Sequence, residues 1–209
     1  MRALVILTVT TNPNRQALVR RGFTLNYLTI AYNTMEAVVS VTAGLVSGSV
    51  ALVGFGIDSA IEVTSAAAAQ WRLRRDLDAT RRQRVELLTH RIIGWSFLVL
   101  ALYVTADSIQ SLLAREEPDK SVIGVAILVL SVAIMPALAR AKRRVAMAMD
   151  SRSLKAEAKQ TSLCAYLSAI ALAGVGLNAI LGWWWADPVS ALAMVPIIAR
   201  EGFEGVASH

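Results

Sequence analysis

The chain has 209 residues, of which 56% are hydrophobic and 17% are charged, and its mean hydropathy is +0.53. Soluble domains are nearer to about 45–50% apolar, so this composition argues against an ordinary soluble protein. The net charge of +6 is of the sign that nucleic-acid binders carry, but no stretch is left over for a soluble nucleic-acid-binding domain, and no nucleic-acid partner is expected.

Six apolar segments have the length and composition of membrane-spanning helices. A hydrocarbon core of about 30 Å needs roughly 20 apolar residues in a helix. Helices are required because lipid cannot satisfy free backbone groups. The sequence therefore predicts an all-α polytopic membrane protein. In chain order the expected spans are Phe23–Leu45, Val50–Trp71, Leu87–Leu113, Val122–Leu138, Ala156–Leu177 and Pro188–Ala199.

Two connections carry local signals. Only Val46–Ser49 joins the first two spans, so these spans must form an antiparallel hairpin. Gly44 and Gly48 lie four residues apart there, which suits either close helix packing or the start of the turn. At the sixth span, Asp187 and Pro188 are expected to begin the helix, with Asp187 at the N-cap and Pro188 at the first helical position.

The distribution of Lys and Arg predicts the orientation in the membrane. With the N-terminus inside, the inner regions hold 19 of the 21 basic residues, and the outer loops hold only Arg115 and Lys120. Positive charge favours the cytoplasmic side, so both termini are expected there. We expect a cytoplasmic segment over 1–21, a six-helix domain over 22–200 and a short cytoplasmic tail over 201–209, in a bacterial-type inner or plasma membrane.

Asp58 and Glu62 are the most informative residues, because they lie four residues apart in the middle of the second span. This spacing places both carboxylates on one helical face, where like charges repel. Each acid at mid-bilayer costs about 2.5–3.5 kcal/mol on insertion scales. A bound cation would remove both penalties, which predicts an ion site. The competing interpretation is that protonated acids hydrogen-bond within a helix interface.

Further candidate metal ligands lie in the fifth span, at a depth in the membrane similar to that of Glu62. At a rise of about 1.5 Å per residue, Cys164 reaches the same depth as Glu62. Gln160 lies one turn further in on the same face, and Glu157 lies near the inner mouth. Two carboxylates, an amide oxygen and a thiol suit Zn²⁺ or a similar borderline metal better than Mg²⁺ or Ca²⁺. Gln160 is a weak ligand, so orienting a neighbouring ligand is its alternative role.

Glu36, in the first span, is a further candidate. It is expected to serve as an added ligand or proton relay, or alternatively to form a hydrogen bond between helices. The single cysteine excludes a disulfide within the chain. Apart from the carboxylates already assigned, no span carries a Ser/His or paired-Asp arrangement that could supply a nucleophile and a base, so an enzyme is not expected.

Three motifs carry a resemblance to a known family. The run Gly48–Val53, followed by Asp58-x-x-x-Glu62, resembles the second helix of the cation diffusion facilitators, also called cation efflux proteins. The segment Leu154–Cys164 is similar to their fifth helix, and Trp184–Pro188 to the segment that leads into their sixth. The motifs occur in the family's order, and the resemblance covers about residues 22–206.

The resemblance implies a six-helix transmembrane domain, homodimeric assembly and export of Zn²⁺ or related divalent ions (Co²⁺, Cd²⁺, Ni²⁺ or Fe²⁺) in exchange for protons. No tightly bound cofactor is implied. By position, Asp58, Glu62, Gln160 and Cys164 would hold the metal. Gln160 stands where the family usually has His, and Cys164 stands where it usually has Asp. The chain looks closest to the short members that consist of the transmembrane domain.

An antiport mechanism is expected from linkage, because metal binding requires deprotonated ligands and so expels protons. The alternative function is a non-transporting membrane scaffold or regulatory subunit, in which the buried acids serve helix packing. The two interpretations differ in one respect: a scaffold should tolerate neutral amides at Asp58 and Glu62, whereas a transporter should lose metal binding.

Overall fold

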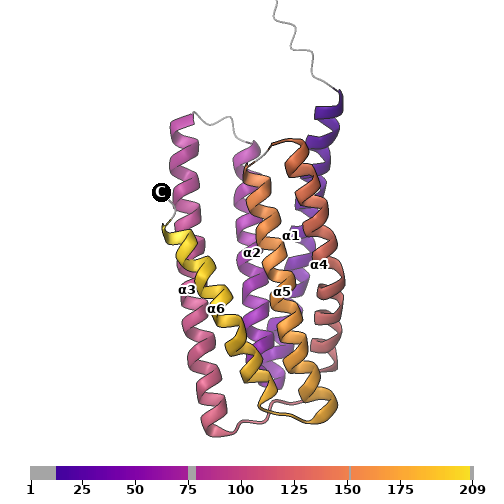
Figure 1. Cartoon of the computed structure of the whole chain (residues 1–209), viewed down its shortest axis with the longest axis vertical. Coiled ribbons are helices and arrows are strands. Elements are labelled where there is room, and N and C mark those ends of the chain that lie inside the picture. The colour runs from indigo at the N-terminus through magenta and orange to yellow at the C-terminus, as the bar shows by residue number, and fades with distance from the viewer. Residues whose placement is uncertain (1–12, 75–78, 151, 208–209) are drawn as a thin grey trace, which may run out of the picture.

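The computed structural model describes residues 13–74, 79–150 and 152–207. This part of the chain consists of helices and their short connections, so the expected all-α fold is confirmed. The helices run side by side in an elongated bundle (Figure 1). They are α1 (Pro13–Ser47), α2 (Val50–Arg74), α3 (Ala79–Ala114), α4 (Val122–Ala148), α5 (Arg152–Leu181) and α6 (Ala186–Ala207).

Each expected span lies within one helix, but several helices continue well beyond the apolar run at the basic end. The basic region between the fourth and fifth spans is itself largely helical, because α4 extends to Ala148 and α5 begins at Arg152. The helices α2, α3, α4 and α5 are long and apolar enough to cross a membrane by length and hydropathy. The apolar stretch of α1 is interrupted by Asn33 and Glu36. That of α6 is bounded by charged residues.

The hairpin between α1 and α2 uses its two glycines differently. Gly48 has a φ of +70°, a backbone conformation that favours glycine, and it makes the turn. Gly44 lies against α2, where an added Cβ would come within 2.8 Å of the Val53 backbone nitrogen. Both interpretations of the pair are therefore correct, one for each glycine.

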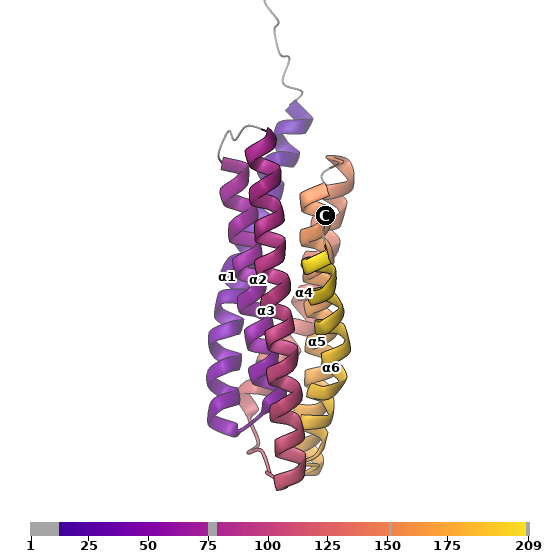
Figure 2. The same cartoon turned by 90° about the vertical axis from the view of Figure 1, so that its left-hand side faces the viewer.

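The bundle has two layers, with α1–α3 on one side and α4–α6 on the other (Figure 2). The most extensive helix pairs are α1 with α2, α4 with α5 and α3 with α6. The helix α2 also contacts α3, α5 and α6, so it occupies a central position. Its buried residues therefore face several helices, which is where a site shared between helices can form.

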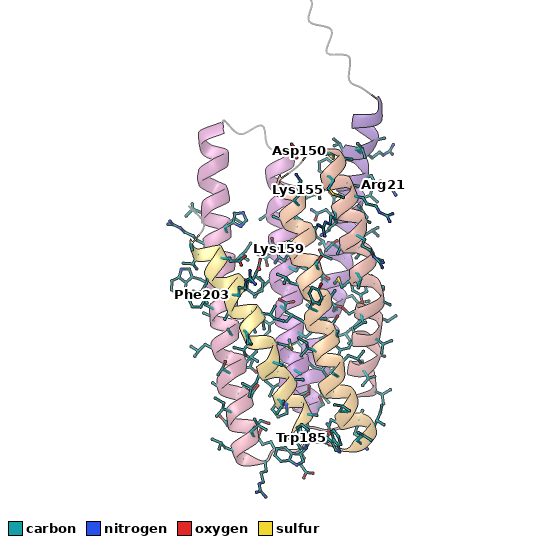
Figure 3. All side chains as sticks on the ribbon, viewed as in Figure 1. Arg21, Asp150, Lys155, Lys159, Trp185 and Phe203 are labelled. Carbon is teal, nitrogen blue, oxygen red and sulfur yellow. The ribbon has the colours of Figure 1, made fainter. Side chains whose placement is uncertain are left out.

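The bundle surface suits a bilayer. Large apolar side chains on the outside, such as Leu102, Ile123 and Ile180, are exposed, and acyl chains can cover them. Arg21, Asp150 and Lys155 gather at one end, which is named the inner end after the orientation expected from the sequence, and Trp185 lies at the opposite, outer end (Figure 3). Trp183 and Trp185 stack there with ring centroids 5.2 Å apart, as expected for an aromatic belt at a membrane interface.

The expected role of Asp187 as the N-cap of its own helix is wrong. The helix α6 begins at Ala186, so Asp187 lies in its first turn. Its buried carboxylate instead accepts hydrogen bonds from the Ser49 hydroxyl and from the Ala51 backbone N–H. Both donors belong to the start of α2, whose first N–H groups have no partner within that helix. Asp187 therefore caps the neighbouring helix and fastens α6 to α2.

Candidate metal centre

Glu36 brings three helices together in the interior. Its side chain is fully buried on α1. The Ser59 hydroxyl of α2 donates to Glu36 Oε2 at 2.8 Å, and the Cys164 thiol of α5 donates to the same oxygen at 3.9 Å. The hydroxyls of Tyr32 and Ser131 lie beside the carboxylate. Its other oxygen, Oε1, has no hydrogen-bond partner among the described residues. Glu36 therefore points into the bundle, toward α2 and α5.

Asp58 lies beside the same thiol. Its carboxylate is buried on α2 and contacts Cys164. The Cys164 side chain is itself buried, and the charges of Glu36, Asp58 and Glu62 all act on it. The Cys164 thiol thus interacts with a carboxylate of α1, that of Glu36, and with a carboxylate of α2, that of Asp58.

Glu62 lies one helical turn from Asp58 and is also buried. The Thr161 hydroxyl of α5 donates to Glu62 Oε1 at 2.6 Å, while Glu62 Oε2 has no hydrogen-bond partner within residues 13–74, 79–150 and 152–207. The structure therefore brings Asp58, Glu62 and Cys164 to one interface between α2 and α5. None of the three faces the lipid side of the bundle.

Glu157 lies one turn from Thr161 toward the inner end of α5. The Ser65 hydroxyl of α2 donates to Glu157 Oε1 at 3.3 Å. The ammonium of Lys142, on α4, lies 3.7 Å from Glu157 Oε2. Glu157 therefore lies next to the centre on α5, but its carboxylate is paired with Lys142.

Gln160 lies one turn from Cys164 on α5 but is less buried than Cys164. Its side chain is half-buried, and no described residue hydrogen-bonds with its enclosed amide nitrogen Nε2. The fully buried position on this stretch of α5 is instead Thr161, which continues the line from Glu157 to Cys164. The role of Gln160 as a ligand stays a prediction.

Thr161 and Lys142 were not predicted from the sequence. Thr161 carries no charge, and hydroxyl residues are common in membrane helices, so nothing marked it. Lys142 was counted with the inner basic region. A signal was present, because Ser131, Met135, Ala139 and Lys142 follow one another at the spacing of a buried helical stripe.

The acids surround the thiol without forming a compact cluster. Within residues 13–74, 79–150 and 152–207, no group of three or more His, Cys, Asp and Glu side chains lies close enough together to hold a metal ion. The distances explain this, since Glu36 and Asp58 lie near Cys164 whereas Glu62 is engaged with Thr161. Three acids therefore lie near one buried thiol, and a change of side-chain rotamer would be needed to gather them on one ion.

Comparison with known proteins identifies the family. Residues 27–208 match the cation efflux transmembrane domain. The chain belongs to the cation efflux family, a family of transporters, and is an integral multi-pass membrane protein. The resemblance noted from its motifs is confirmed.

One curated protein is a distant relative of this chain. An uncharacterized transporter of Synechocystis sp. is 25% identical over an alignment of 157 residues that covers 71% of this chain and 50% of the relative. The chain spans about half the length of that relative.

Proposed function

We propose that this chain exchanges a divalent transition-metal cation, with Zn²⁺ favoured, for protons through the centre between α2 and α5. One observation carries the proposal: the carboxylates of Glu36, Asp58 and Glu62 surround the buried thiol of Cys164. Isolated charges are costly in the membrane interior. A dehydrated cation offsets that cost and needs the oxygen and sulfur donors that this centre offers.

The ligands proposed from the sequence are Asp58, Glu62, Cys164 and Gln160. Zn²⁺ favours four tetrahedral ligands. Since Gln160 is half-buried and Glu36 hydrogen-bonds with Cys164, Glu36 is the better placed fourth donor, and Gln160 would orient a neighbour. The thiolate favours Zn²⁺, Cd²⁺, Co²⁺, Ni²⁺ or Fe²⁺ over harder ions.

Proton exchange follows from the same side chains. Without metal, like charges so close together in the membrane interior repel one another, so part of the set carries protons. A metal ion binds the deprotonated forms, so the carboxyl O–H and the thiol S–H lose their protons as the metal is bound. If the centre opens alternately to each side, metal moves one way and protons the other. The relative's description as a transporter agrees with this function, and the family resemblance supports a homodimer.

Purified protein in liposomes tests the proposal with a panel of Zn²⁺, Co²⁺, Ni²⁺, Cd²⁺, Mn²⁺ and Fe²⁺ under a fixed pH gradient. We expect metal uptake to rise when the liposome interior is more acidic than the medium, because protons then leave as metal enters. Uptake should fall when this pH gradient is collapsed. Uptake indifferent to the gradient would refute proton coupling alone. A chain that moves no metal of the panel above empty liposomes would be a scaffold. Light scattering in detergent tests the dimer.

A further inference from the structure

Lys142 is a fully buried lysine in the middle of the bundle. Its Nζ donates to Thr161 Oγ1 at 3.0 Å and lies 3.7 Å from Glu157 Oε2. A buried ammonium is tolerated only where partners compensate for lost water. These two partners explain how the charge is tolerated. They do not require a charge, since an apolar side chain could fill the same place on the buried stripe of α4.

The hydrogen bonds direct this charge at the metal centre. Thr161 accepts from Lys142, so its own O–H proton is free to be donated. The Thr161 hydroxyl oxygen, Oγ1, lies 2.6 Å from Glu62 Oε1 and 3.1 Å from the backbone carbonyl oxygen of Glu157. The shorter contact is the one to Glu62. One hydroxyl therefore links the ammonium of α4 to the carboxylate of a proposed metal ligand on α2.

We propose that Lys142 is an internal counter-cation that competes with the transported metal for the carboxylates of the centre. The inference rests on the proposed function. Without metal, the ammonium holds Glu62 through Thr161. With metal bound, Glu62 turns to the ion, and Lys142 keeps its pair with Glu157.

The competition has a use in transport. A transported ion must be held well enough to be taken up and weakly enough to leave. Three carboxylates and a thiolate would hold Zn²⁺ very tightly. A fixed positive charge one hydroxyl away repels the divalent ion, and this repulsion is strong because little water screens it. Lys142 thus lowers the affinity for metal and speeds its release.

The alternative role is a structural ion pair with Glu157. In that case, replacing Lys142 would loosen the bundle, and metal affinity would fall or stay constant. The two roles therefore predict opposite directions for the apparent affinity, which makes the direction the useful measurement.

The test measures Zn²⁺ uptake into liposomes by wild-type protein and by Lys142→Met, Lys142→Gln and Lys142→Arg. The Met variant removes charge and hydrogen bond. The Gln variant removes the charge but can still donate to Thr161, and the Arg variant keeps the charge. The matched control is Lys155→Met, since Lys155 is an exposed lysine near the inner end of α5. Thermal melting in detergent shows which variants are folded.

We expect the Met and Gln variants to lower KM for Zn²⁺ by about 10-fold or more and to lower the maximal rate, because release slows. The Arg and Lys155→Met variants should keep both values within about twofold of wild type. The proposal is overturned if a folded neutral variant keeps or raises KM, or if the Arg variant behaves as the neutral ones do. A wild-type chain that transports no metal would instead overturn the proposed function. If the Met variant does not fold, the Gln variant decides.

Discussion

Buried carboxylates occur in two regions of this bundle, and the two regions treat them differently. At the outer end, both oxygens of Asp187 are occupied, one by the Ser49 hydroxyl and one by the Ala51 N–H. In the centre, Glu36 Oε1 and Glu62 Oε2 are buried without a hydrogen-bond partner in the part of the chain that the structure describes. Buried polar groups are normally satisfied. A satisfied acid therefore indicates a structural fastening, and an unsatisfied one indicates a place for a ligand.

The largest expected effect is the loss of transport when Asp58→Asn and Glu62→Gln are combined. The amides keep the shape of the acids but cannot supply negative oxygens to a cation. We expect Zn²⁺ flux into liposomes to fall about 100-fold or more, a loss of about 2.7 kcal/mol or more in transport free energy. The fold should persist, since two repelling charges are removed.

The matched control for this pair is Asp107→Asn. Asp107 is a half-buried acid near the outer end of α3 that accepts a hydrogen bond from Tyr103, and its neutralisation should leave flux within about twofold. Near-normal flux in the double variant would show that the central acids serve packing, as the scaffold interpretation requires.

A second prediction concerns the outer end. Asp187→Ala leaves the Ser49 hydroxyl and the Ala51 N–H without their acceptor, and an unsatisfied buried group costs about 1–3 kcal/mol. We expect Tm in detergent to fall by about 5 °C, since a domain of this size loses roughly 2–4 °C per kcal/mol. Flux per folded molecule should change little. If Tm stays constant while flux disappears, Asp187 belongs to the transport machinery and the contrast between the two regions fails.

A third prediction uses the sulfur. Cys164→Ser replaces a soft donor by a hard one of similar size, so soft and borderline ions should suffer most. We expect KM for Cd²⁺ and Zn²⁺ to rise about 10-fold while KM for Mn²⁺ changes about twofold or less. Uptake of the three ions under one pH gradient measures this. Equal changes for all three would mean that the thiol packs in the centre without binding the ion.

The sequence predicted the helices well, because bilayer thickness dictates the length of an apolar run. It could not predict where helices end in water, since a polar helical extension lacks that signal. For this reason the continuation of α4 to Ala148 was missed, and Lys142 was assigned to a surface region.

The centre was predictable only in part. Asp58 and Glu62 were evident because charge is rare in apolar spans. The face of Glu36 depends on how α1 packs, which one sequence does not show. Thr161 was hidden because a hydroxyl does not disturb the apolar pattern. Its importance comes from its neighbours on α2 and α4.

The smallest expected effect lies at the inner end, where charges are exposed and paired. Glu204 accepts hydrogen bonds from Lys159 at 2.5 Å and Arg200 at 2.9 Å. The hydrogen bond from Lys159, and to a lesser extent the one from Arg200, lowers the pKa of Glu204 below its ordinary value of 4.5. A lowered pKa means that this stabilisation is present at neutral pH and is lost as the pH falls through the folded value. Exposed pairs contribute little, so Glu204→Gln should lower Tm at pH 7 by about 2 °C or less.

The pH dependence of that difference is the informative part. The Tm gap between wild type and Glu204→Gln should stay constant down to about pH 5 and close below about pH 4, as wild-type Glu204 takes up its proton. Glu117→Gln, at an exposed acid of the outer connection, should show no such closing gap. A gap that persists at low pH would mean that Glu204 contributes through packing. In that case the inner end would stabilise the bundle without ion pairing, and the difference between exposed paired acids and buried central acids would be smaller than the contacts indicate.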